Sequence, residues 1–135
     1  MSPYSKLAHL FLEVRTQIKL YHWQTRIYAR HKATDRFIET FEPLVDRFVE
    51  AAQGITIAEV GQTAPRIVNF KDLSDQQKEL IEDFVQTPTD SNAIDYLSLF
   101  RDYMANFELP QSELAQIRDD MLEIVDVTLY LFTLK

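Results

Sequence analysis

The chain has 135 residues, of which 46% are hydrophobic, enough to form the core of one globular domain covering residues 1–135. It contains no cysteine, which excludes disulfides, thiolate metal sites and a cysteine nucleophile. Its net charge of −7 argues against nucleic-acid binding by phosphate neutralisation and is compatible with a protein that gathers cations.

The first predicted helix occupies the N-terminal part of the chain. Its apolar residues recur at steps of three and four, the period of an amphipathic helix: Leu7, Leu10, Phe11, Val14, Ile18 and Tyr21. On a helical wheel, His22 falls at the edge of this apolar stripe. The pattern therefore predicts a helix with one buried face and a histidine beside it.

The second predicted helix begins near Thr34, a suitable N-cap, with Asp35 in its first turn. Gly54 is a natural stop for this helix. Its apolar stripe consists of Phe37, Phe41, Leu44, Val45, Phe48 and Ala52. Pro43 lies inside the stretch and removes one backbone hydrogen bond, at a cost of about 3 kcal/mol in a helix interior. A bend at Pro43, or a break into two shorter helices, is therefore expected.

The sequence of the second half of the chain predicts three further helices. Residues 55–72 lack helical period and are expected to be an ordered connection. A capping-box pattern at residues 74–77 opens a short helix with Leu80, Ile81, Phe84 and Val85 inward. A break with a new cap at residues 87–90 precedes a long helix at 91–107, and the last helix carries Leu114, Ile117, Met121, Val125, Thr128 and Phe132. Four long helices and one short helix in the middle connection predict an all-α four-helix bundle.

Residues 22–50 contain a sparse set of side chains of the kind that bind metals: His22, His31, Asp35, Asp46 and Glu50. Two imidazoles and three carboxylates form a mixed nitrogen and oxygen ligand set that suits iron, manganese or zinc. Asp35 follows His31 by four residues, and Glu50 follows Asp46 by four. Each pair is therefore expected on one helical face, about one turn apart.

The three carboxylates are predicted to face away from the core of their own subunit. On a wheel of about 100° per residue, Asp35, Asp46 and Glu50 lie opposite the apolar stripe of the second helix. A metal site built from them is therefore expected at an interface with another copy of the chain. All three histidines, His9 included, lie in the first quarter of the chain. The second half thus lacks the Glu-x-x-His motif of an intrasubunit di-iron bundle, which also favours an intersubunit site.

This segment resembles the signature of the Dps-like ferritins, the DNA-protection-during-starvation proteins. In that family a His-Trp pair near the end of the first helix is followed by a second His, and then by Asp, Asp and Glu. The matching residues here are His22-Trp23, His31, Asp35, Asp46 and Glu50, and from His31 onward the spacings of 4, 15 and 4 agree. His22 and His31 are nine residues apart, three fewer than is usual in the family, so the intervening turn is shorter. The compact segment is also similar to uncharacterised ferritin-like proteins of large DNA viruses and phages.

The resemblance implies a ferritin-like bundle that forms a homo-oligomer, at least a dimer and up to a cage of twelve subunits. It implies a di-metal site at each two-fold interface, where histidines of one subunit and carboxylates of its mate bind Fe(II). Dioxygen or peroxide would oxidise the iron, with Zn or Mn as alternative metals. Trp23, beside the first ligand, would quench radicals. DNA binding in this family usually needs a basic tail, and the first six residues carry only one lysine, so nucleic acid is not an expected partner.

Each of these residues also has an ordinary structural interpretation. Asp46 and Glu50 fit a solvated acidic face, His22 a core-edge histidine bonded to a backbone carbonyl, and His31 a helix-capping turn. Trp23 fits simple packing. The interleaved basic residues, which are Arg26, Arg30, Lys32, Arg36 and Arg47, fit either interface salt bridges or neutralisation of the carboxylates.

Three functional hypotheses follow from these patterns. The first is a Dps-like ferritin that oxidises iron for storage and oxidative protection. The second is a catalytically inactive, ferritin-like structural or interaction protein, and the third is a small helical adaptor. No apolar run reaches the roughly 18 residues of a membrane span, and the N-terminus lacks the basic start and cleavage site of a signal peptide. A cytoplasmic location is therefore expected, or the virion if the protein is viral.

Overall fold

The protein is all helical in the part of the chain that the structure, a computed structural model, describes: residues 2–69, 80 and 82–135. The helices are α1 (Pro3–Gln24), α2 (Tyr28–Val60), α4 (Glu82–Val85), α5 (Ala93–Asn106) and α6 (Ser112–Phe132). No strand occurs in these residues, so the all-α prediction is confirmed. The predicted capping box at residues 74–77, together with Ile81, lies outside the described residues.

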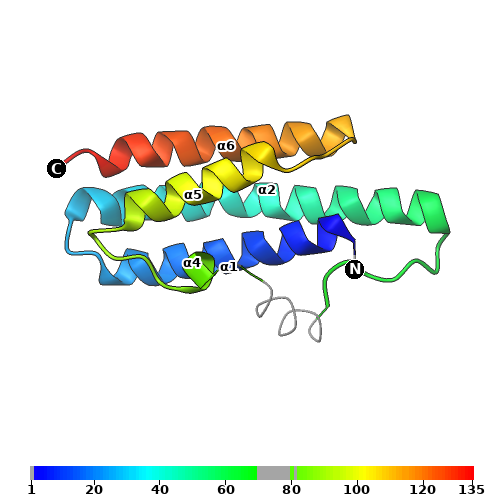
Figure 1. Ribbon diagram of the computed structural model, residues 1–135, viewed down its shortest axis with the longest axis horizontal. Helices are drawn as coiled ribbons and strands as arrows, with labels where there is room; N and C mark the ends of the chain where they lie inside the picture. The colour runs from blue at the N-terminus through cyan, green and yellow to red at the C-terminus, as the bar shows by residue number, and fades with distance from the viewer. Residues whose placement is uncertain (1, 70–79, 81) are drawn as a thin grey trace.

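The long helices form a bundle around α2, which packs against α1 on one side and α6 on the other (Figure 1). The helix α5 packs against α6, and the single-turn α4 contacts both α1 and α5. Four long helices and one short one therefore share a common core, as the helical periods predicted. None of the described helices is long and apolar enough to cross a membrane.

Helix α1 begins and buries its residues as its sequence predicts. The Ser2 hydroxyl accepts a hydrogen bond from the Ser5 amide at 3.2 Å, and Pro3 occupies the first helical position, where its missing N–H costs nothing. All six residues of the predicted apolar stripe are buried: Leu7, Leu10, Phe11, Val14, Ile18 and Tyr21. His22, at the edge of that stripe, is also buried, with an exposed fraction of 7%.

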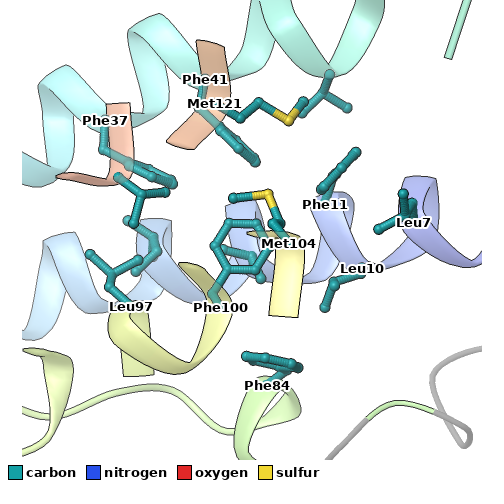
Figure 2. Close-up of a cluster of buried hydrophobic side chains, with 14 of the residues drawn as sticks. Leu7, Leu10, Phe11, Phe37, Phe41, Phe84, Leu97, Phe100, Met104 and Met121 are labelled. Atoms are coloured by element: carbon teal, nitrogen blue, oxygen red, sulfur yellow. The ribbon is translucent and has the colours of Figure 1, made fainter. Parts of the chain in front are cut away.

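Aromatic rings from three helices meet at the centre of the core (Figure 2). The Phe11 ring of α1 makes edge-on contacts with Phe41 and Phe48 of α2 and with Phe100 of α5, at centroid distances of 6.0, 5.1 and 6.3 Å. Such edge-to-face pairs add about 0.5–1.5 kcal/mol each beyond the burial of their area. Phe84 extends this cluster from α4 by an edge-on contact with Phe100.

Helix α2 begins earlier and ends later than predicted. It starts at Tyr28, where the amides of Arg30 and His31 bond to the Ile27 carbonyl. The predicted N-cap, Thr34, is therefore wrong: this residue lies inside the helix and is fully buried. The connection from α1 to α2 consists of residues 25–27 only.

Of the two outcomes predicted at Pro43, a bend or a break, the break does not occur, because α2 is one helix of 33 residues with this proline inside it. Pro43 is exposed, so water can solvate the carbonyl that loses its partner, while Phe41 and Val45 on either side are buried in the core. Gly54 is not the stop either. The helix ends at Gly61, whose φ of 109° is a conformation that favours glycine. The prediction of an irregular connection is thus wrong for residues 55–60 and correct for 61–69.

The last two helices agree closely with the prediction, whereas α4 begins only at Glu82, so that Leu80 lies outside it. The helix expected at 91–107 is α5, Ala93–Asn106. All six predicted inward residues of the last helix are buried in α6: Leu114, Ile117, Met121, Val125, Thr128 and Phe132. The C-terminal end of α6 lies near the turn between α1 and α2, at the left of Figure 1, where Arg30 donates a hydrogen bond to the Phe132 carbonyl.

Candidate metal-binding site

His22 and His31 lie face to face at the turn between α1 and α2. Their rings are stacked, with centroids 4.0 Å apart and planes 16° from parallel. Nδ1 of His22 is 2.9 Å from the carbonyl oxygen of His31, and Nδ1 of His31 is 2.9 Å from the carbonyl oxygen of His22. The short turn therefore does not separate the two histidines; it places them in direct contact.

The two reciprocal hydrogen bonds determine which nitrogen of each ring carries the proton. A carbonyl oxygen only accepts, so Nδ1 must be the protonated donor in both rings. Each neutral ring then keeps a free electron pair on Nε2, the form in which imidazole binds a metal. The hydroxyl of Thr34, 2.8 Å from Nδ1 of His22, donates to the Arg30 carbonyl and is free to accept from the same Nδ1–H.

His22 and His31 differ in their exposure to solvent. His22 is buried, whereas His31 is exposed. Burial lowers the pKa of His22, and the neighbouring His31 lowers it further. His22 is therefore held neutral, as a metal ligand must be. The contact of its Nδ1 with a carbonyl is also what the interpretation as a core-edge histidine anticipated.

The three candidate carboxylates point outward, as the helical wheel predicted. Asp35, Asp46 and Glu50 are all exposed on α2. Asp35 lies one turn after His31, close enough to affect the pKa of His22. Asp46 is fifteen residues after His31, which is about 22 Å along an unbroken helix. Metal–ligand bonds are about 2 Å long, so His31 and Asp46 of the same chain cannot bind one ion.

One chain therefore holds the predicted ligands in two separate groups: His22, His31 and Asp35 around the α1–α2 turn, and Asp46 with Glu50 near the middle of α2. Among the described residues, no group of three or more His, Asp or Glu side chains converges closely enough to hold a metal ion. These two groups of predicted ligands are the two part-sites of the metal site that the sequence predicts.

Two of the basic residues near these carboxylates, Arg30 and Arg47, contact other groups. Arg30 is buried inside the subunit, so its predicted role in an interface salt bridge is wrong. Arg47 lies 3.8 Å from Asp120 of α6. No salt bridge among the described residues involves Asp35, Asp46 or Glu50. Their oxygens are not neutralised by the arginines that the sequence interleaves with them.

Trp23 lies on the surface beside the histidine pair. Its exposed fraction is 66%, so the interpretation as a packing residue does not hold within this subunit. The side chain lines a mostly apolar groove of about 380 Å³ between α1 and α2, together with Arg15, Thr16, Lys19, Leu20, Ile38 and Glu42. The ammonium of Lys19 lies 5.2 Å from the centre of the Trp23 ring.

A buried polar network next to the histidines was missed by the sequence analysis. The Tyr21 hydroxyl donates to Oδ1 of Asp90 at 2.7 Å and accepts from Nη1 of Arg30 at 3.1 Å. The burial of Arg30 could have been predicted from the sequence. If α2 is extended back to Tyr28, the wheel places Arg30 on the same face as Phe37, where an arginine must be paired.

The environment of Asp90 favours its charged form. Partial burial by itself raises the pKa of this carboxyl, but hydrogen bonds from Thr25, Tyr21 and the Arg26 amide, with the charge of Arg30, outweigh it and lower the pKa. Asp90 therefore stays ionised and accepts from several donors. The predicted cap at this position is wrong, because residue Asn92 precedes α5 and the Asp90 carboxylate bonds to the α1–α2 turn instead.

Comparison with known proteins identifies a family but no activity. No curated protein and no solved structure matches the chain. A family described as a family of unknown function, DUF5856, matches residues 22–132, which include the histidine pair, all three carboxylates and Asp90. Since this match covers most of the 135 residues, the chain belongs to the DUF5856 family of unknown function.

Proposed function

We propose that two copies of this chain bind and oxidise Fe(II) at a shared site, as in the Dps-like ferritins that residues 22–50 resemble. His22, His31 and Asp35 of one copy would face Asp46 and Glu50 of the other. The observation that carries the proposal is the reciprocal bonding of the two histidines. It commits both Nδ1 atoms to carbonyl groups and leaves both Nε2 atoms as donors for a metal.

The geometry of α2 supports a second copy as the source of the carboxylates. Two antiparallel α2 helices related by a two-fold axis near Thr40 would bring residues 31–35 of each copy beside residues 46–50 of the other. Such an isologous interface repeats every contact, so it creates two equivalent sites. The continuity of α2 through Pro43 keeps the spacing between the two part-sites rigid.

The charges on α2 and its preceding turn are complementary in the same arrangement. Basic side chains, which are Arg26, Lys32 and Arg36, are exposed at the start, and acidic side chains, which are Glu39, Asp46 and Glu50, are exposed farther along. Antiparallel pairing places the basic part of each copy against the acidic part of the other. Trp23 and Tyr28 are 66% and 73% exposed beside the basic part, and exposed aromatic residues are enriched at protein interfaces.

In the proposed reaction Fe(II) is the substrate, and each ion loses one electron to become Fe(III). Hydrogen peroxide accepts two electrons from two Fe(II) ions and is reduced to two hydroxides; dioxygen is the other oxidant that fits. The carboxylates of Asp46 and Glu50 would favour the more highly charged ferric product. The two neutral imidazoles would complete a nitrogen and oxygen ligand set suited to iron.

The test compares the wild type with an Asp46→Asn/Glu50→Gln variant and with a control, Asp95→Asn/Glu123→Gln. The control removes two exposed acidic side chains from α5 and α6 and leaves α2 unchanged. We expect the α2 variant to stay folded and to lose most of its Fe(II) oxidation, measured by ferric absorbance after addition of peroxide, while the control keeps it. Equal rates in all three proteins would contradict the proposal.

Crystals soaked anaerobically with Fe²⁺ locate the site directly. An anomalous peak at the iron edge between His22 or His31 of one copy and Asp46 or Glu50 of another is expected. A strictly monomeric protein at micromolar concentration would rule out a shared site. A dimer that forms by this face but binds no iron would support the alternative, an inactive ferritin-like structural protein.

A further inference from the structure

We infer that Asp90 is a positioning residue for the His22–His31 pair, holding the turn between α1 and α2 from outside both helices. The importance of this role for iron rests on the proposed function, but the geometric role does not. Asp90 lies in the connection between α4 and α5, more than sixty residues along the chain from the turn that it contacts.

The carboxylate of Asp90 accepts three hydrogen bonds from the turn and the helix before it. Oδ1 accepts from the hydroxyl of Tyr21 at 2.7 Å and from that of Thr25 at 2.6 Å, while Oδ2 accepts from the amide of Arg26 at 3.1 Å. Hydrogen bonds to a charged acceptor are roughly twice as strong as those between neutral groups. One side chain thereby fixes the end of α1 and two of the three residues in the turn.

Arg30 continues the same network into α2. Its Nη1 donates to the backbone carbonyl of Asp90 at 2.7 Å, and its Nε donates to the carbonyl of Phe132 at 3.3 Å. The guanidinium also lies 5.2 Å from the centre of the Phe132 ring. The start of α2 is therefore attached both to the segment that carries Asp90 and to the end of α6.

These attachments bracket the histidine pair in the chain. Tyr21 directly precedes His22, and Arg30 directly precedes His31. The reciprocal bonds between the histidines need the last turn of α1 and the first turn of α2 in one relative position, since each bond joins a ring on one helix to the backbone of the other. A small rotation between the helices lengthens both bonds together. By tying Tyr21, Thr25 and Arg30 to one point, Asp90 prevents that rotation.

The test uses metal-free protein and the substitution Asp90→Asn, with Asp95→Asn as a control. Asparagine keeps the size of the side chain but supplies one oxygen where the carboxylate supplies two, so at least one of the three donors loses its partner. Long-range proton–nitrogen NMR reports the tautomer of each histidine. We expect the Nδ1–H form for His22 and His31 in the wild type and in the control, and a mixture of both tautomers in the Asp90→Asn protein.

The Tyr21→Phe variant tests the same inference if the Asp90→Asn protein fails to fold. It removes one donor to Asp90 and retains the buried ring, so we expect the same shift of tautomer at smaller amplitude, with helical circular dichroism unchanged. Unaltered Nδ1–H tautomers in a folded variant would overturn the inference, as would a wild type that lacks them. Because no iron is present, this result is separate from that of the oxidation test: the tautomers can depend on Asp90 whether or not the protein oxidises iron.

Discussion

The backbone carbonyl of His22 accepts a hydrogen bond from the ring of His31, and the carbonyl of His31 accepts one from the ring of His22, both at 2.9 Å. The two residues are neighbours because only three residues connect α1 to α2. This exchange places two imidazoles with the same tautomer side by side at the end of a helical hairpin. It fixes both Nδ1 atoms against backbone carbonyls, and it links the geometry of the candidate site to the geometry of the turn.

His22 should contribute more than His31 to the stability of the fold. His22 is 7% exposed and bonds to both the His31 carbonyl and Thr34, whereas His31 is exposed. We expect His22→Ala to lower the free energy of unfolding by about 1–3 kcal/mol, because it removes a buried ring and leaves the buried Thr34 hydroxyl without the imidazole N–H that it accepts from. His31→Ala should lower it by less. Urea unfolding followed by circular dichroism measures both, and a larger loss for His31→Ala would contradict the assignment.

Acid should destabilise the protein first through His22. Its folded-state pKa lies below its ordinary value of 6.5, chiefly because of burial, so the unfolded chain takes up a proton before the folded one does. The free energy of unfolding is therefore unaffected by the titration of His22 above pH 6.5, where this residue is neutral in both states. It decreases as the pH falls from 6.5 toward the folded-state pKa. Urea unfolding at a series of pH values should show this decline in the wild type. A His22→Gln protein should show a smaller decline over the same window, and an equal one would refute the assignment.

Asp90 should contribute a second, more acidic phase. Its folded-state pKa lies below the ordinary value of 3.8, because the hydrogen bonds that it accepts outweigh the effect of its burial. The stabilisation from these bonds is therefore present above pH 3.8 and is lost as the pH falls through the folded-state pKa. Unfolding of wild type and Asp90→Asn in acid should converge, since protonation removes the charge that the substitution removes. A constant difference between them at all pH values would show that the charge of Asp90 is not involved.

Replacing Gly54 should stabilise the protein. This glycine lies inside α2, is exposed, and an added Cβ would meet nothing within 4 Å. Alanine is favoured over glycine in a helix interior by about 0.5–1 kcal/mol. We expect Gly54→Ala to raise the free energy of unfolding by about that amount. The matched control is Gly61→Ala, which should lower stability because the φ of Gly61 is 109°; stabilisation by both substitutions would contradict the helix boundary.

Phe11 should be one of the most sensitive positions in the core. Its ring is fully buried and contacts Phe41, Phe48 and Phe100 from two other helices. Substitution of a buried phenylalanine by alanine costs about 3–5 kcal/mol, from lost burial and from the cavity left behind. We expect Phe11→Ala to lower the free energy of unfolding by that amount, measured in urea. A loss similar to that of an exposed residue such as Tyr130→Ala would contradict this packing.

Local sequence determined the helical class and most of the buried surface. Apolar residues at helical spacing identified the whole buried face of α6 and the six large apolar residues that α1 buries, because periodicity depends only on residues a few positions apart. The same wheel showed that Asp35, Asp46 and Glu50 face outward. The spacing of these ligands carried the resemblance to Dps-like ferritins, although their function as a metal site stays a prediction.

Only the tertiary structure decided where α2 begins and ends and how the histidines meet. Thr34, Pro43 and Gly54 all carry local signals for helix ends, yet α2 continues past each one. Burial of Phe37, Phe41 and Val45 in the core favours the helix past Thr34 and Pro43. The His22–His31 stack depends on attachments from Asp90 and Phe132, which lie 60 and 102 residues away from Arg30 in the chain. Contacts between such distant residues leave no periodic pattern in a single sequence, so the fold alone could bring them together.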